Sequence, residues 1–376
     1  MSNGTLESRI INRWREQPYN FYCLIIFLIE VIDLALILKK DKIKEFLEIL
    51  GKNYEIIAPV KEGDLINFKV VKDFSKVILD YPKTVKSPKE FLFPQSEELY
   101  KYKFSGKDVE VKPAELDKKP RAIVAIHPCD ARSLTIMDKV FNWDYSDKLY
   151  VERRKNTLLI SMSCKSPDWS CFCTSVEGKP YDAEGTDIHF AEINDNYYVE
   201  SRSDKGEAVI KDAKKLFTDA GKKDKEKYEA LQKELMAKLP VKVNIKEVSE
   251  NLDLMFDDKI WDNISIKCIH CGACAYLCPT CHCFDISDQG NYEEGKRVRC
   301  WDACMHGHFT RMAGGHNPRD AEKTRYRQRI FHKFNYYKKN FNTISCVGCG
   351  RCIAECPAGM DLVKTLQIIE KGGSHE

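Results

Sequence analysis

Hydrophobic and polar positions predict an α/β domain in the first half of the chain, over residues 40–202. Apolar residues at helical spacing predict helices, continuous apolar runs predict buried strands, and alternation around a polar turn predicts a hairpin. The predicted helices are 41–50 and 129–141, the strands are 54–60, 121–128 and 156–164, and the hairpin is 188–201, which turns at 194–196.

The second half has a different pattern. Residues 203–260 are rich in lysine and glutamate with apolar positions at helical spacing, which predicts a charged helical linker. Residues 318–341 also have helical spacing, within a segment 261–376 that holds most of the cysteines. The predicted fold class is therefore α+β, with an N-terminal α/β domain followed by a mainly helical domain.

Residues 1–39 are treated as an N-terminal extension. Its stretch 21–38 is strongly apolar but contains Glu30 and Asp33. Each acidic residue near the centre of a membrane helix costs roughly 2.5–3.5 kcal/mol, so no integral membrane span is expected. No small-residue cleavage site follows, which argues against a signal peptide. A buried or partner-facing helix, an over-extended translation start and a membrane-surface contact stay open.

Charge and cysteine content narrow the classes of function. The 60 basic and 57 acidic residues give a net charge of +3, too small to indicate a polyanionic partner. Seventeen cysteines are a large excess, and twelve of them lie between Cys268 and Cys356 in short runs that suit metal ligation better than disulfides. A reducing, cytoplasmic or anaerobic setting follows.

Two of these runs share the pattern C-x2-C-x2-C-x3-C-P. In such a run three cysteines surround one [4Fe-4S] cluster, and the fourth, which precedes a proline, reaches the other cluster. We therefore expect two [4Fe-4S] clusters with crossed ligation. The first is expected on Cys268, Cys271, Cys274 and Cys356, and the second on Cys346, Cys349, Cys352 and Cys278.

Neighbouring residues fit the same chemistry. Gly272, Gly348 and Gly350 let the backbone curl around an anionic cluster, and Lys267 and Arg351 could offset its charge. A zinc ribbon is the alternative, but a zinc ion takes four ligands and leaves two complete runs unexplained. Sixty-seven residues separate Cys278 from Cys346, which favours a helical dicluster ferredoxin domain over a compact one.

Two further groups of cysteines leave alternatives open. Cys281, Cys283, Cys300 and Cys304 follow the first run and are either packed thiols or ligands of another cluster. In the N-terminal domain, two cysteines follow buried strands and two form a C-F-C turn, where strand ends of a doubly wound sheet converge. Cys129, Cys164, Cys171 and Cys173 could therefore hold a third cluster, or be structural thiols or a redox-active pair.

The segment 319–339 combines eight basic residues with five aromatic ones. Such a pattern occurs in nucleic-acid-binding proteins, but a helix whose aromatics pack around the clusters and whose cations offset their charge explains it without a further partner. No nucleic-acid partner is therefore expected. The nearby histidines are interpreted as packing groups or as residues behind the ligands: His306, His308, His316 and His332.

The chain lacks the glycine-rich motifs that bind dinucleotides or phosphates, and it lacks a nucleophile elbow. A protein that accepts single electrons but has no site for NAD or flavin exchanges them with protein partners. We predict an electron-transfer component of an oxidoreductase complex rather than its catalytic subunit, with no catalytic residues. The alternative is that this chain itself reduces a small oxidant of the sulfite type at its N-terminal domain.

Several strings together resemble a known family, over residues 40–366. They are RAIVAIHPCDARSL, VERRKNTLLISMSCKSPDWSCFCTS, CPTCHCFDI, RVRCWDACMHGHFTRMAGGHNPR, RQRIFHKFNYY and CVGCGRCIAECP. They resemble the beta subunit of soluble [NiFe] hydrogenases (sulfhydrogenases) and the 4Fe-4S dicluster subunit of anaerobic sulfite reductase. The resemblance implies a subunit between a flavoprotein that oxidises NAD(P)H and a hydrogenase or reductase subunit. The eight ferredoxin-type cysteines match the family position by position, whereas Cys300 stands where a non-cysteine residue is expected.

Overall fold

The computed structural model describes residues 35–373, which belong to one compact unit that starts at Ala35. The predictions for the apolar stretch 21–38 therefore lie outside the described residues up to position 34. The last residues of the predicted extension 1–39, Leu36–Lys39, form strand β1 of a sheet. Among the described residues, no helix has the length and apolar character that crossing a membrane requires.

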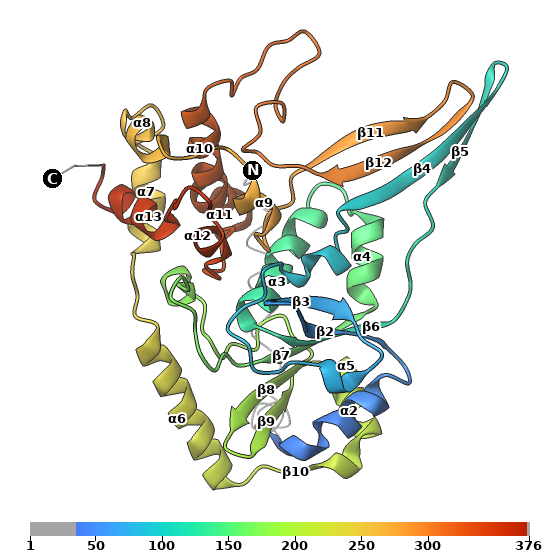
Figure 1. Cartoon of the computed structure of the whole chain (residues 1–376), viewed down its shortest axis with the longest axis vertical. Helices are drawn as coiled ribbons and strands as arrows, with labels where there is room; N and C mark the ends of the chain where they lie inside the picture. Colours follow the sequence, from blue (N-terminus) through green and yellow to red (C-terminus); the bar gives the residue numbers. More distant parts are fainter. Residues whose placement is uncertain (1–34, 374–376) are drawn as a thin grey trace, which may run out of the picture. The chain divides into compact units, whose positions relative to one another are not determined.

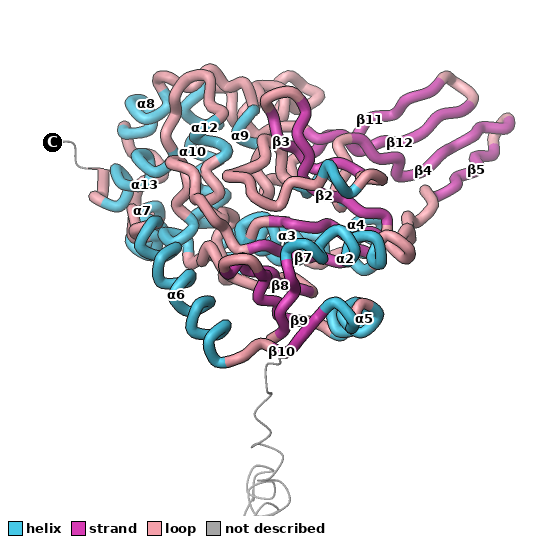
Figure 2. Tube along the Cα trace, turned by 60° about the horizontal axis from the view of Figure 1, so that its bottom comes forward, coloured by secondary structure: helices cyan, strands magenta, loops and turns pink. Residues whose placement is uncertain are grey.

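A mixed sheet of eight strands forms the centre of the N-terminal half (Figures 1 and 2). Strands β2, β6, β7 and β8 are parallel neighbours, and the remaining strands pair antiparallel at the two sides. In spatial order the strands are β10 (Phe217–Asp219), β1 (Leu36–Lys39), β9 (Asn196–Ser201), β8 (Ile188–Ile193), β7 (Thr157–Met162), β6 (Arg121–Ile126), β2 (Glu55–Glu62) and β3 (Leu65–Val70).

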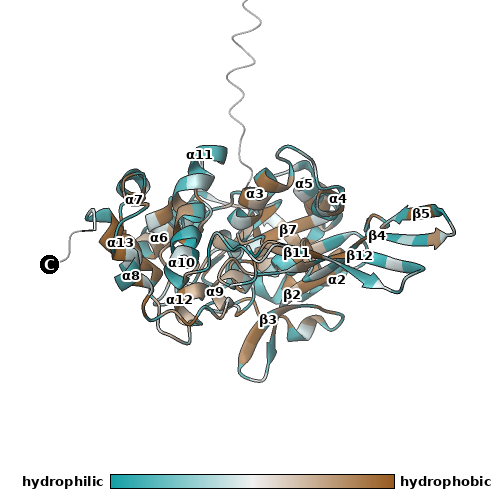
Figure 3. Cartoon of the chain, turned by 90° about the horizontal axis from the view of Figure 1, so that it is seen from above, coloured by the Kyte–Doolittle hydropathy of each residue, from teal (hydrophilic) through white to brown (hydrophobic). Residues whose placement is uncertain are grey.

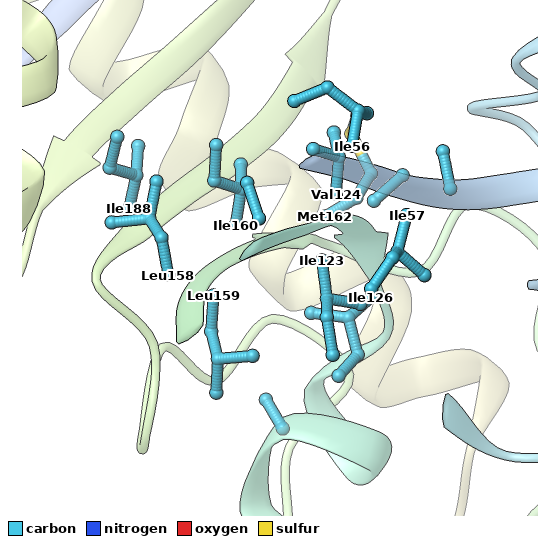
Figure 4. Packing of buried hydrophobic residues seen from close by; sticks show 14 of the residues in the cluster. Ile56, Ile57, Ile123, Val124, Ile126, Leu158, Leu159, Ile160, Met162 and Ile188 are labelled. Carbon is cyan, nitrogen blue, oxygen red and sulfur yellow. The ribbon is translucent and has the colours of Figure 1, made fainter. Parts of the chain in front are cut away.

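The inner strands are apolar along their length because helices and loops cover both faces of the sheet. Every residue of β7 is buried, and it carries the hydrophobic colour in Figure 3. Ile123, Ile160 and Ile188, from three neighbouring strands, belong to one hydrophobic cluster (Figure 4). The same core takes in residues of four helices: α2 (Ile43–Leu50), α3 (Pro128–Phe141), α4 (Lys148–Lys155) and α5 (Asp204–Asp212). These elements confirm the predicted α/β pattern.

A second sheet of four antiparallel strands extends away from the first (Figure 1). It pairs two hairpins that are far apart in the sequence: β4 (Ser96–Ser105) with β5 (Asp108–Pro113), and β11 (Phe284–Gly290) with β12 (Glu294–Trp301). Neither hairpin is among the predicted elements. β5 and β11 are exposed at every position, and their apolar residues, such as Val109, Val111 and Ile286, belong to no buried core. Among the described residues, the C-terminal region is thus mainly helical, with one hairpin and a long loop between β12 and the helix that begins at Glu322.

The helices of the C-terminal region surround a second hydrophobic core. They are α7 (Ile245–Leu252), α8 (Ile260–Ser265), α9 (Ala273–Tyr276), α10 (Glu322–Phe331), α11 (Tyr337–Phe341), α12 (Arg351–Ala354) and α13 (Leu362–Glu370), with a π-helical turn η9 (His332–Tyr336) between α10 and α11. Phe172 and Val176 also belong to this core, although they come from a loop of the N-terminal half. That loop therefore brings Cys171 and Cys173 into the helical region.

The predicted linker is not purely helical. Between α5 and α6 (Lys222–Lys238), strand β10 joins the edge of the large sheet. Helix α6 packs on that sheet, because the ring of Tyr228 stacks on Tyr198 of β9 with 4.5 Å between centroids. Short 3-10 helices lie in connections: η4 (Lys40–Lys42), η5 (Phe74–Lys76), η6 (Pro88–Phe91) and η8 (Lys214–Leu216). The domain boundaries themselves stay a prediction.

His189 on β8 should make the fold sensitive to acid. It is fully buried, with Ser161 Oγ 2.7 Å from Nδ1 and Ser163 Oγ 2.9 Å from Nε2. Burial lowers its pKa to about 3, so the unfolded chain binds a proton below pH 6.5 that the folded chain does not. The free energy of unfolding should fall by about 1 kcal/mol between pH 7 and 5.5 through this residue. Urea midpoints of wild type and His189→Asn at both pH values measure it, and equal acid sensitivity would contradict it.

Candidate iron–sulfur sites

The two cysteine runs fold into similar loops. Gly272 and Gly350 each adopt a positive φ, of +77° and +75°, which glycine adopts without a Cβ penalty. Each of them precedes a one-turn helix, α9 or α12, that contains the third cysteine of its run. The internal repeat of the sequence is therefore a repeat of local structure.

Each run shares a cavity with the last cysteine of the other run. Cys268, Cys271 and Cys274 line a cavity together with Cys356 from the second run; Cys352 also reaches its wall. A second cavity is lined by the other set, Cys346, Cys349, Cys352 and Cys278. Crossed ligation requires this arrangement, and the cysteines are free thiols in the structure. The ligation itself stays a prediction.

The four N-terminal cysteines also come together. Cys129 lies at the start of α3 after β6, Cys164 follows β7, and Cys171 and Cys173 lie in the C-F-C turn, where 3-10 helix η7 (Cys173–Val176) begins. All four line one cavity. Burial raises the pKa of each thiol, that of Cys173 to about 12. Thiolates would therefore be costly here without a bound cation, and iron would supply one.

The C-F-C turn lies directly on the second run. The backbone N–H of Phe172 donates to the carbonyl of Gly348 at 2.9 Å. A Cβ on Gly348 would lie 2.5 Å from the backbone of Cys173, and its φ is +64°, so only glycine allows this close approach.

The three cavities form a continuous row. Cys352 and Arg329 line both the first and the second cavity, while Gly348 and Cys349 line both the second and the third. Consecutive cysteine sets are thus separated by shared side chains rather than by intervening elements. Electrons tunnelling between such centres would cross short, protein-filled gaps.

Three buried cations surround the second set. Lys333 Nζ lies 3.3 Å from Cys278 Sγ, and Arg329 Nη1 lies 3.5 Å from Cys281 Sγ. Lys89 donates to the carbonyls of Cys278 and Cys281 at 2.8 and 2.9 Å. Among the described residues, no carboxylate forms an ion pair with any of these three cations. Buried charges need an opposite charge nearby, and anionic iron–sulfur clusters would provide it.

The pKa values of these cations reflect the same imbalance. Burial lowers the pKa of Lys89. Burial also opposes the charge on Lys333, but the thiolates of Cys278 and Cys281 more than offset it, so the pKa of Lys333 is raised. Conversely, a hydrogen bond from Cys281, together with Lys333 and Arg329, holds the pKa of Cys278 well below its usual range.

Arg351 lines the third cavity beside Cys129 and Cys349, and it also forms an ion pair. Its guanidinium forms a bidentate ion pair with Asp130 at 2.6 and 2.7 Å, and both side chains are 1% exposed. The pair neutralises Arg351 and fixes the second run against the start of α3. Lys267 is exposed. Of the buried cations near the cysteines, Lys89 was not predicted from the sequence, because it lies far from the runs. Lys333 was included only as one cation of a basic segment.

The remaining cysteines divide into two kinds. Cys300 lies 3.4 Å from Ser96 Oγ in the four-stranded sheet, apart from the cysteine sets. Cys283 and Cys304 hydrogen-bond to one another, which lowers the pKa of Cys283 to about 6, and they line a cavity of about 300 Å³ with His282 and His332. Packed thiols and a further cluster both stay open for Cys281, Cys283 and Cys304.

The basic aromatic segment 319–339 faces inward at its key positions. Tyr326, Phe331, Phe334 and Tyr337 are buried, as is Lys333. This matches the interpretation in which the segment packs around the cysteine sets. Among the described residues, no set of three cysteines has its sulfur atoms close enough together to share a single metal ion.

Comparison with known proteins gives two matches. A family model described as a 4Fe-4S dicluster domain matches residues 267–360, which include both cysteine runs. The chain is also 31% identical over 338 residues to the sulfhydrogenase 2 subunit beta of Pyrococcus furiosus. That alignment covers 89% of this chain and 98% of the relative.

Proposed function

Because the chain belongs to the family of sulfhydrogenase beta subunits, we propose that it carries electrons between a flavoprotein that oxidises NAD(P)H and a catalytic hydrogenase or reductase subunit. Its dicluster domain makes it an iron–sulfur electron-transfer subunit. The partners are proposed from the family resemblance and from the lack of a nucleotide or flavin motif in this sequence. The cysteine content points to a reducing, cytoplasmic setting.

The observation that carries the proposal is the row of three cysteine-lined cavities. We propose two [4Fe-4S] clusters with crossed ligation and a third on Cys129, Cys164, Cys171 and Cys173. The unpaired buried cations around the second set support the presence of anions there. At one end of the row Cys271 is exposed, which suits electron exchange with a partner.

The rival function, reduction of a small oxidant at the N-terminal domain, has less support. All four thiols that line the cavity around Cys129 would serve as ligands of the proposed third cluster. A cluster with four thiolate ligands leaves no open iron position at which a small oxidant could bind. We therefore assign this cavity to electron transfer.

Iron and sulfide analysis of the anaerobically purified chain tests the cluster content. Three clusters give about twelve iron atoms per chain and two give about eight. Replacing Cys171 and Cys173 together with alanine should remove about four iron atoms, and Cys300→Ala is the matched control that should remove none. An unchanged iron content in the double variant would refute the third cluster, and about four iron atoms or zinc in the wild type would refute the dicluster assignment.

Reduction kinetics test the partner assignment. The clusters should be reduced by NAD(P)H only when the flavoprotein is added, and oxidised again only when the catalytic subunit and its substrate are present. Optical bleaching at the cluster absorption band follows both steps. Steady turnover of sulfite or a similar oxidant by the isolated chain would favour the rival function instead.

A further inference from the structure

Asp302, His306 and His308 converge in the loop that follows β12. Their possible ligand atoms all lie within 4.8 Å of one another. Among the described residues, no other group of three or more histidine, cysteine, aspartate or glutamate side chains is this close. Asp302 is 10% exposed, His306 22% and His308 70%. The group is thus anchored at its base and open to solvent at one side. Neither the cluster sites nor the proposed electron transfer uses these side chains.

The loop that holds them is tightly folded. The backbone N–H of Ala303 donates to Asp302 Oδ1 at 2.6 Å, and the N–H of His306 donates to the carbonyl of Ala303 at 2.9 Å. Because of this turn, His306 lies on the same side of the loop as Asp302. His308 lies beside His306, with 5.1 Å between the two ring centroids. The convergence is therefore local and arises from the backbone.

The distances suit a metal ion better than hydrogen bonds alone. Asp302 Oδ1 lies 3.0 Å from His306 Nδ1 and 3.6 Å from His308 Nε2. A hydrogen bond explains the first distance, but 3.6 Å is too long for one. Ligands bound tetrahedrally at roughly 2.05 Å from Zn²⁺ are about 3.3 Å apart. Both separations are within a few tenths of an ångström of that value.

The local charge also permits a cation. Among the described residues, the ion-pair partners of Asp302 are His306 and His308, and no lysine or arginine is paired with it. The carboxylate is therefore not already neutralised by a fixed positive charge. The exposed edge of His308 leaves an entry path from solvent.

We propose that Asp302, His306 and His308 bind one divalent cation of the zinc type. Two imidazole nitrogens and one carboxylate oxygen are a donor set that Zn²⁺ and its first-row neighbours prefer over Mg²⁺ or Ca²⁺. Three protein ligands leave one tetrahedral position for water.

The site adjoins the loop of the first cysteine run. A Cβ on Gly272 would lie 2.6 Å from His306 Nε2, so the glycine leaves room for the imidazole. The rings of His306 and Tyr276 are also 6.0 Å apart. A bound ion would hold His306 in place against this loop, and so fix the loop to the end of β12.

Equilibrium dialysis of the anaerobically purified full-length chain against Zn²⁺, with metal analysis of zinc and iron together, tests the site. The wild type should bind one Zn²⁺ per chain. Asp302→Asn and His308→Ala should each lower the affinity for this ion by about tenfold or more. The matched control is His316→Ala, an exposed histidine of the same segment, which should bind like the wild type. Iron content should stay constant across all four proteins.

Two results would overturn the proposal. One is a wild type that binds no Zn²⁺ beyond what replaces lost iron, and the other is equal Zn²⁺ affinity in wild type, Asp302→Asn and His308→Ala. Zinc bound to vacant cysteines would be unaffected by His308→Ala, so incomplete cluster loading does not imitate the expected loss. Failure of the cluster assignment would appear in the iron content alone.

Discussion

Removing two cysteines should cost one cluster or two clusters, depending on whether the pair comes from different runs or from the same run. With crossed ligation, Cys268 and Cys356 bind the same cluster, so the double alanine variant should lose about four iron atoms per chain. Cys346 and Cys356 bind different clusters, so their double variant should damage both and lose up to about eight. Iron analysis and EPR of the reduced proteins measure the difference.

The two double variants control for one another, because each removes two ligands and shares Cys356→Ala. Two ligands are removed because a cluster that loses a single ligand can persist in altered form. Uncrossed ligation predicts the reverse order, with the larger loss in the Cys268/Cys356 variant. The cavities place Cys356 with the first run and Cys278 with the second, so the reverse order would contradict the arrangement seen in the structure.

The parts of the site that the sequence predicted are those with local determinants. Ligand spacing within a run is set over about ten residues, and glycines at the left-handed positions are visible in the sequence. The convergence of Cys129 and Cys164 followed from another local rule, since both come just after buried parallel strands. The fold class could be predicted for the same reason, because long apolar runs and strong periodicity determine the inner strands and the core helices. The structure confirms it.

What the sequence did not predict depends on contacts across long separations. Lys89 donates a hydrogen bond to the carbonyl of Cys281, which is 192 residues further along the chain. Nothing in the sequence near Lys89 distinguishes it from a surface lysine. The four-stranded sheet pairs β4 with β12, about 190 residues later in the sequence, and its outer strands β5 and β11 are exposed at every position, so no buried apolar face specifies the pairing. The grouping of Asp302, His306 and His308 likewise became visible only in the structure, because it depends on the turn after β12. The spacing of these residues in the sequence is equally compatible with histidines that only pack against their neighbours.

Replacing Lys333 with methionine should lower the reduction potential of the second cluster. Lys333 belongs to the π-helical turn η9, is 3% exposed, and donates to Thr280 Oγ1 at 3.0 Å and the Ser345 carbonyl at 2.8 Å besides contacting Cys278. A positive charge about 7 Å from a cluster stabilises the added electron by about 2 kcal/mol at an effective dielectric constant of about 20, or about 100 mV for one electron. EPR-monitored redox titration measures the shift, with Lys338→Met on the adjacent α11 as the control.

The sign of the stability change in the same variant decides whether a cluster is present beside Lys333. If a cluster lies beside Lys333, the methionine variant removes a compensated charge and leaves the cluster's charge partly unbalanced, so the holoprotein should lose iron faster on mild heating. If the cysteines are only packed thiols, Cys278 can take up a proton once Lys333 is replaced, so no unpaired charge is left behind. Methionine should then raise the stability of the chain, since an apolar side chain avoids the cost of desolvating the Lys333 charge. A more stable variant with unchanged potentials would therefore contradict a cluster at this position, and it would do so independently of any measurement of iron.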